Sequence, residues 1–104
     1  MSLIKAFLNQ DASIKPFLRA GNGKHIYGEI EERPCRMEYG FREKVVYKNP
    51  AGVIVETVSS ALMFVEGEPI PINSLVTHDD NVMRVIRCQP MRGFGPSHLE
   101  VLLE

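Results

Sequence analysis

Apolar and polar residues alternate along much of this chain with a period of two. The clearest such run is Cys35–Phe41 (CRMEYGF), and a second is Ser97–Glu104 (SHLEVLLE). Successive side chains of a β-strand point to opposite faces, so each run predicts a strand with one buried and one solvent-facing side. The same alternation does not fit the 3.6-residue period of an amphipathic helix.

Turn-forming sequences separate these runs. Gly21–Gly23 (GNG) and Asn49–Gly52 (NPAG) contain residues that accept positive φ, and His78–Asn81 (HDDN) contains side chains that hydrogen-bond to their own backbone. The longer segment Glu68–Cys88, EPIPINSLVTHDDNVMRVIRC, predicts a proline-stiffened turn, a short strand, a tight polar turn and a second strand. Residues Tyr39–Val55 predict one extended hairpin whose tip lies near Asn49–Gly52.

Prolines and small residues mark where the other strands are interrupted. Pro16 divides a short strand at Ile14–Arg19, because proline inside a strand favours an edge or a bulge. A half-buried strand with an acidic face follows the first turn and is predicted to end at Arg33–Pro34. Within the apolar segment Val53–Val65, the small residues Ser59–Ala61 predict a bulge or a close neighbour.

Together these elements predict an all-β fold, a small antiparallel β-barrel or sandwich with an inserted hairpin loop and a short N-terminal arm. About six short strands and no long helix are expected. The length of 104 residues predicts that residues 1–104 form a single domain. The predicted core consists of Met37, Tyr39, Phe41, Leu62, Phe64, Val85, Leu99 and Val101.

Composition and charge are those of an ordinary globular chain. Charged residues make up 24% and hydrophobic residues 44%, and the formal net charge is −1. This balance gives no global electrostatic case for nucleic acid or a membrane surface. No stretch approaches the roughly 18–20 apolar residues that span a bilayer. The N-terminus lacks the pattern of a secretory signal, which predicts a cytoplasmic chain at synthesis.

Candidate chemistry is sparse. Cys35 and Cys88 lie far apart without the spacing of a zinc site, and they are predicted to be small buried hydrophobic residues. A disulfide would require their two strands to pair. His25, His78 and His98 lie in or beside polar turns or on an exposed strand face, and they are predicted to be surface histidines. No catalytic, cofactor-binding or metal-binding residue is predicted, so the chain is not expected to be an enzyme.

Four segments carry a resemblance to a known family. They are AFLNQDASIKPFL, GNGKHIYGE, SSALMFVEGEPIPINSLVTHDDNVMRVI and GPSHLEVLLE. Their order, from about Phe7 to the end, resembles the phage and prophage head–tail connectors, also called head-closure, stopper or "minor capsid" joining proteins. The shared features are strand-and-turn patterns, and none of them is a catalytic motif.

The resemblance implies a structural protein of the virion neck, made in the host cytoplasm. Such proteins are small β-barrels with an inserted loop, and they assemble as a ring, usually twelve-fold. The implied partners are further copies of the chain, the portal and adaptor proteins above, the tail proteins below, and DNA that passes non-specifically through the channel. No cofactor and no membrane partner are implied. In some members the inserted loop closes the channel, whereas the candidate insertion here, Arg42–Gly52, is short.

Two segments are predicted to mediate these contacts. The inserted hairpin is basic and ends in a turn, and together with the resemblance this predicts that it faces the channel or an adjacent ring. Its candidate residues are Arg42, Lys44, Lys48, Asn49 and Gly52. The apolar residues of the N-terminal arm have no strand to join, so the arm is predicted to contact a neighbouring subunit through Leu3, Ile4, Phe7 and Leu8.

An alternative function belongs to a different class, a small β-barrel of OB or SH3-like type that binds nucleic acid or another ligand. Such a module needs an aromatic and basic face on one sheet, on which bases can stack. The candidate residues for this face are Tyr27, Tyr39, Phe41, Tyr47, Arg36, Arg42 and Lys44.

Overall fold

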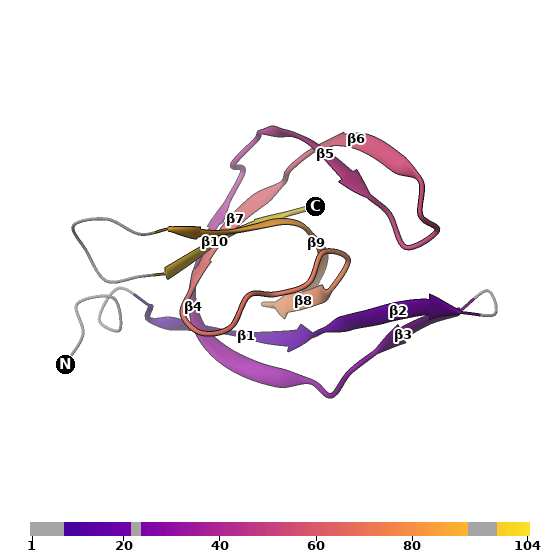
Figure 1. Cartoon of the computed structure of the whole chain (residues 1–104). Coiled ribbons are helices and arrows are strands. Elements are labelled where there is room, and N and C mark those ends of the chain that lie inside the picture. Colours follow the sequence, from indigo (N-terminus) through magenta and orange to yellow (C-terminus); the bar gives the residue numbers. More distant parts are fainter. Residues whose placement is uncertain (1–7, 22–23, 92–97) are drawn as a thin grey trace.

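The fold is all-β and is built around a closed six-stranded barrel (Figure 1). The computed structural model describes residues 8–21, 24–91 and 98–104. The barrel strands are β1 (Gln10–Lys15), β4 (Glu31–Tyr39), β7 (Ala61–Val65), β10 (His98–Leu103), β9 (Asn81–Met91) and β8 (Leu75–His78), in that order around the barrel. The other strands form two hairpins: β2 (Phe17–Gly21) pairs with β3 (Lys24–Tyr27), and β5 (Lys44–Lys48) pairs with β6 (Ile54–Val58).

All pairings are antiparallel, and the described residues contain no helix. The predicted fold class is therefore confirmed, including the inserted hairpin. No described helix has the length and apolarity needed to cross a bilayer.

The barrel interior holds the main hydrophobic core. Period-2 alternation directs Cys35 and Met37 of β4 inward, where they meet Met63, Val85 and Val101 from other strands. Burying such aliphatic side chains contributes roughly 1.5–3 kcal/mol each. Five of the predicted core residues are buried as expected: Met37, Leu62, Val85, Leu99 and Val101.

A second core lies outside the barrel, beneath the β5–β6 hairpin. Val45 and Tyr47 of β5 pack on Leu62, Ile86 and Leu102, which point outward from β7, β9 and β10. The barrel strands at this place are therefore apolar on both faces, because the hairpin covers the outer one. This arrangement explains why ALMFV in β7 is a continuous apolar run.

The prediction that Tyr39 and Phe41 are buried is wrong. Tyr39 is 49% exposed and Phe41 is 40% exposed. Tyr39 is the last residue of β4, so its side chain lies at the end of the strand and is not enclosed, and Gly40 (φ +82°) turns the chain out of the strand before Phe41. Phe64 is half-buried and packs against the second core, so it is less enclosed than predicted.

The strand predicted to end at Arg33–Pro34 continues through these residues. Pro34 lies within β4 and pairs with Asp11 of β1. The β4–β7 ladder begins only at Cys35, so the missing N–H of the proline falls outside that ladder and the strand tolerates it.

The β8–β9 turn confirms one prediction and corrects another. Asp79 (φ 47°) and Asp80 (φ 66°) both adopt left-handed geometry, as the HDDN sequence predicts. His78, however, is only 6% exposed. It occupies an inward position of β8, and its Nδ1 is 2.5 Å from the hydroxyl oxygen of Tyr39. The exposed tyrosine thus covers the histidine.

The two cysteines are free thiols. Cys35 lies in β4 and Cys88 in β9, and β7 and β10 separate these strands in the barrel, so they do not pair. Cys35 is fully buried, whereas Cys88 is half-buried. Burial raises the pKa of the Cys35 thiol from 9.0 to about 11, and the charges of Asp11 and Asp79 act in the same direction.

Candidate protein interface: the β5–β6 hairpin

The root of the β5–β6 hairpin is held by one buried serine. Ser59 is 1% exposed, and its hydroxyl donates to the carbonyl of Phe41 (2.6 Å) and accepts from the N–H of Glu43 (3.0 Å). The N–H of Ser59 donates to the Glu43 carbonyl (2.9 Å). Next to it, the N–H of Ser60 donates to the Leu103 carbonyl (2.7 Å), which confirms the close neighbour predicted at Ser59–Ala61.

The inner face of the hairpin is fixed by the last residue of the chain. The hydroxyl of Tyr47 donates to Glu104 Oε1 and that of Thr57 donates to Oε2, each at 2.6 Å. Burial raises the pKa of Tyr47 above its usual value, and the hydrogen bond to Glu104 adds to this effect, while Arg84 opposes it. Both strands of the hairpin are therefore joined to the barrel through one carboxylate.

The tip of the hairpin is the predicted turn. The N–H of Gly52 donates to the carbonyl of Asn49 (2.9 Å), and Asn49 Oδ1 accepts from the N–H of Val53 (3.0 Å). Gly52 has φ +83°, which favours glycine. The carbonyl of Lys48 accepts from the side-chain amide of Asn73 (2.9 Å), so the tip is also bound to the loop before β8.

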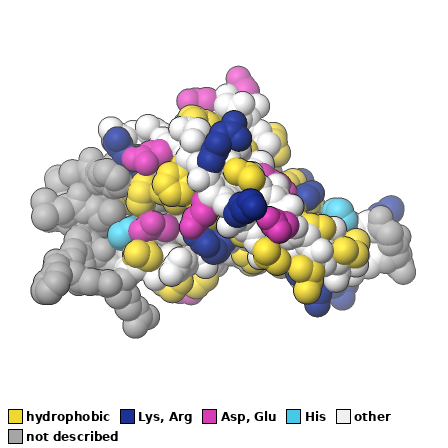
Figure 2. Space-filling model, turned by 90° about the horizontal axis from the view of Figure 1, so that it is seen from above, with side chains coloured by type: hydrophobic (Ala, Val, Ile, Leu, Met, Phe, Trp, Pro, Cys, Tyr) yellow, Lys and Arg dark blue, Asp and Glu magenta, His cyan; other side chains and the backbone are white. Residues whose placement is uncertain are grey.

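The outer face of the hairpin combines exposed apolar side chains with lysines. Cross-strand pairs share a face, and the register pairs Lys44 with Val58, Val46 with Glu56 and Lys48 with Ile54. We call these six residues the outer face. Val46 is 64% exposed and Ile54 is 71% exposed. Figure 2 looks onto this side of the molecule and shows hydrophobic side chains interleaved with both basic and acidic ones.

The structure thus brings together part of the predicted contact set. Lys44 and Lys48 lie on the outer face, and Asn49 and Gly52 form the turn, whereas Arg42 is exposed in the connection before β5. The apolar part of the face was not predicted. The signal was present in the sequence, because Val45–Tyr47 and Ile54–Val58 carry apolar residues on both sides of each strand.

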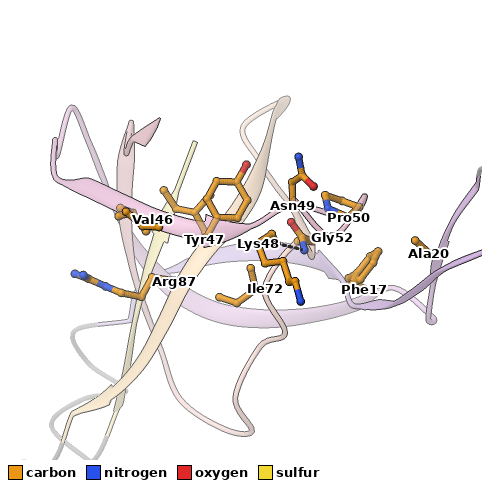
Figure 3. Close-up of a pocket in the computed structure, with 13 residues that line it drawn as sticks. Phe17, Ala20, Val46, Tyr47, Lys48, Asn49, Pro50, Gly52, Ile72 and Arg87 are labelled. Carbon is orange, nitrogen blue, oxygen red and sulfur yellow. Dashed lines mark hydrogen bonds between the residues drawn. The ribbon is translucent and has the colours of Figure 1, made fainter. Parts of the chain in front are cut away.

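An open groove of about 560 Å³ separates the two hairpins (Figure 3). Phe17 and Ala20 of β2 lie at one side of it, and Val46 and Tyr47 of β5 lie at the other. Val45 and Ile72 add to its apolar lining. Its residues come from distant parts of the chain, so no local pattern predicts it.

Most polar side chains that line the groove form ion pairs or hydrogen bonds with other residues. Arg87 at the rim forms an ion pair with Glu43 (2.5 Å). Asn73 also lines the groove, and its Oδ1 is buried without a hydrogen-bond partner among the described residues.

The aromatic and basic face required by the alternative function is not assembled. Tyr47 is 8% exposed, so its ring is not available for stacking. Tyr27 packs edge-on against Phe17, with ring centroids 5.7 Å apart, and the ammonium of Lys15 lies over its ring. The remaining candidates, Tyr39 and Phe41, lie at and beyond the end of β4.

The N-terminal arm falls largely outside the described residues, including Leu3, Ile4 and Phe7. Leu8, the first described residue, is 6% exposed and lies beside Arg33 and Glu66. Within the described part of the chain, no group of three or more His, Cys, Asp or Glu side chains is placed to hold a metal ion.

Comparisons with family models, curated proteins and solved structures found no match to this chain. A function therefore has to be argued from its own residues and their geometry.

Proposed function

We propose that this chain is a structural protein of the head–tail connector type and a subunit of a ring in the neck of a phage particle. The resemblance of its strand-and-turn order to that family motivates the proposal and suggests a twelve-fold ring. The subunit is made in the host cytoplasm. The ring joins the portal and adaptor complex to the tail and encloses the channel through which DNA passes.

The outer face of the β5–β6 hairpin is the observation that carries this proposal. Val46, Ile54 and Val58 are respectively 64%, 71% and 43% exposed on a single two-stranded ribbon. Single exposed apolar residues are ordinary on a protein surface, but a contiguous exposed group indicates a contact site. The ribbon is also held rigidly at its root, inner face and tip, which suits a surface that has to be presented to a neighbour.

The same face favours protein over DNA as its contact. A DNA-facing surface presents cations to phosphates and does not need exposed aliphatic side chains. Lys44 is already paired with Glu56 (3.5 Å), which lowers the net positive charge of the face. Of the two positions predicted for this hairpin, the channel or an adjacent ring, the geometry therefore supports the contact with protein better.

The experiment is native mass spectrometry of the full chain, alone and co-expressed with the portal and adaptor proteins of the same genome. The proposal predicts a discrete multimer that binds the portal complex. A chain that stays monomeric at high concentration and does not bind the portal complex would contradict the proposal.

The groove gives the alternative, a ligand- or nucleic-acid-binding module, one specific observation in its favour. It combines an apolar lining with Lys48 and Arg87. Titration with single-stranded oligonucleotides separates the two functions. Saturable binding that Phe17→Ala and Lys48→Ala both weaken would favour the module. The connector proposal predicts no such binding by the isolated chain.

A further inference from the structure

A second exposed apolar patch lies at the junction of β3 and β4 and the neighbouring barrel surface. Ile30 and Val82 are each 64% exposed. With Leu75 they line a hollow of about 230 Å³ on the outside of the barrel. The hollow is therefore an apolar site of a size that can receive one or two aliphatic side chains.

Two glutamates are direct neighbours of residues that line this hollow. Glu32 pairs with Ser13 across the β1–β4 ladder, and Ser13 lines the hollow, so both side chains lie on the same face. Glu29 directly precedes Ile30. Glu29 and Glu32 are exposed, and neither forms an ion pair with another described residue. We call Ile30, Leu75, Val82, Glu29 and Glu32 the Ile30 patch.

One cation, Lys15, lies beside this patch. Lys15 also lines the hollow, but its ammonium lies 5.6 Å from the centroid of the Tyr27 ring. Its positive charge remains, so the charged groups beside the hollow are one ammonium and two carboxylates, with a net charge of −1.

The Ile30 patch and the outer face are complementary. One presents aliphatic side chains beside two carboxylates, and the other presents Val46, Ile54 and Val58 beside Lys44 and Lys48. They lie on opposite sides of the molecule, with the β5–β6 hairpin at the top of Figure 1 and the β3–β4 junction at the bottom. Two different, mutually complementary surfaces on opposite sides generate a ring if the rotation closes.

We infer that the outer face of one copy docks on the Ile30 patch of the next, with aliphatic side chains in the hollow and the lysines against Glu29 and Glu32. This inference rests on the proposed function and names the subunit contact of the ring. Pairing of two outer faces is disfavoured, because each carries two lysines and only one glutamate and would meet like charge.

Charge reversal on each surface tests this contact. The first variant is Lys44→Glu with Lys48→Glu, and the second is Glu29→Lys with Glu32→Lys. Each alone is expected to weaken self-association by about 100-fold or more, because like charges then meet across the contact. An equimolar mixture of the two is expected to assemble in alternation, since each variant then offers a surface that fits the other.

A third variant carries all four substitutions in one chain. It is expected to recover self-association, because its acidic hairpin fits its own basic patch. Pairing of two outer faces would not give this recovery, so the variant separates the two geometries. Lys24→Glu and Glu68→Lys change exposed charges outside both surfaces and serve as matched controls. Circular dichroism checks that each variant is folded.

The outcomes distinguish the contact from the function. In one outcome the wild-type chain forms its multimer and neither charge-reversal variant changes assembly. This outcome would overturn the proposed contact, but it would not contradict the connector proposal. A four-substitution variant that stays dissociated would also overturn the contact. A wild-type chain that remains monomeric, alone and with the portal complex, would overturn both.

Discussion

At the scale of single residues, the hydroxyl of Tyr47 is the strongest test of how the hairpin is fixed. Tyr47 is buried, and its hydroxyl donates to Glu104, which also accepts from Thr57. We expect Tyr47→Phe to lower the free energy of unfolding by about 1–2 kcal/mol, because a hydrogen bond to a charged group is lost. Denaturant unfolding measures this. Tyr27→Phe is the control, since no hydrogen bond of its hydroxyl occurs among the described residues, and a loss equal to that of Tyr47→Phe would contradict the role of Glu104.

The pH dependence of stability follows from two raised pKa values. Tyr47 and Cys35 both have a higher pKa when folded than when unfolded, so folding favours their protonated forms. The stability they contribute is fully present below the unfolded pKa and is lost as pH rises through the folded pKa. For Cys35 this loss begins near pH 9.0 and extends to about 11. Unfolding midpoints are expected to fall over this range, and less steeply in Tyr47→Phe.

Thiol labelling checks the placement of the cysteines. A maleimide is expected to label Cys88 quickly and Cys35 only at the rate of unfolding, because Cys35 is fully buried and its thiol stays protonated. Mass spectrometry of the labelled protein, with Cys88→Ser as the control variant, follows each site. Equal labelling rates in the folded protein would show that Cys35 is accessible.

Several residue environments could not be predicted from the sequence. Tyr39 continues the alternation of β4, but its exposure depends on where the barrel ends, and the alternation itself does not mark that edge. His78 is the last residue of β8 and precedes two aspartates, which indicates a surface turn, yet Tyr39 covers its ring. These two errors have one physical cause. The contact between Tyr39 and His78 joins residues that are distant in sequence, so no local pattern predicts it.

At the scale of elements, the hairpin β5–β6 is a separate structural layer on the barrel. Its turn and strands were predicted from NPAG and the flanking alternation, because turn chemistry and period-2 patterning are local. The closure of six strands into a barrel was predicted only as an alternative to a sandwich. Strand order is set by pairings such as β1–β8 and β4–β7, and a single sequence carries no direct signal for them.

Ser59 gives the prediction that belongs to this scale. We expect Ser59→Ala to lower the free energy of unfolding by about 1–3 kcal/mol, because the carbonyl of Phe41 and the N–H of Glu43 lose their buried partner. Hydrogen exchange is expected to speed up in β5 and β6 before it does so in the barrel strands. Ser13→Ala, in β1, is the control, because no hydrogen bond of its hydroxyl occurs among the described residues. Uniform acceleration over all strands would contradict an independently anchored hairpin.

At the scale of the whole molecule, the two charged apolar surfaces turn a small barrel into a unit that can repeat. The outer face is on one side and the Ile30 patch is on the other, so each copy offers one surface of each kind. A head-to-tail contact of this type also covers part of the groove between the hairpins, because Val46 and Lys48 of the outer face line it. The connector proposal therefore needs only one contact to explain a ring.

Electron cryomicroscopy of the chain co-assembled with its portal and adaptor proteins tests the central claim most directly. The account predicts a closed ring below the portal, in which the outer face of each hairpin lies against the Ile30 patch of the next subunit. A reconstruction without such a ring, or one with the hairpins on the outer rim away from the channel and from every neighbouring protein, would contradict it.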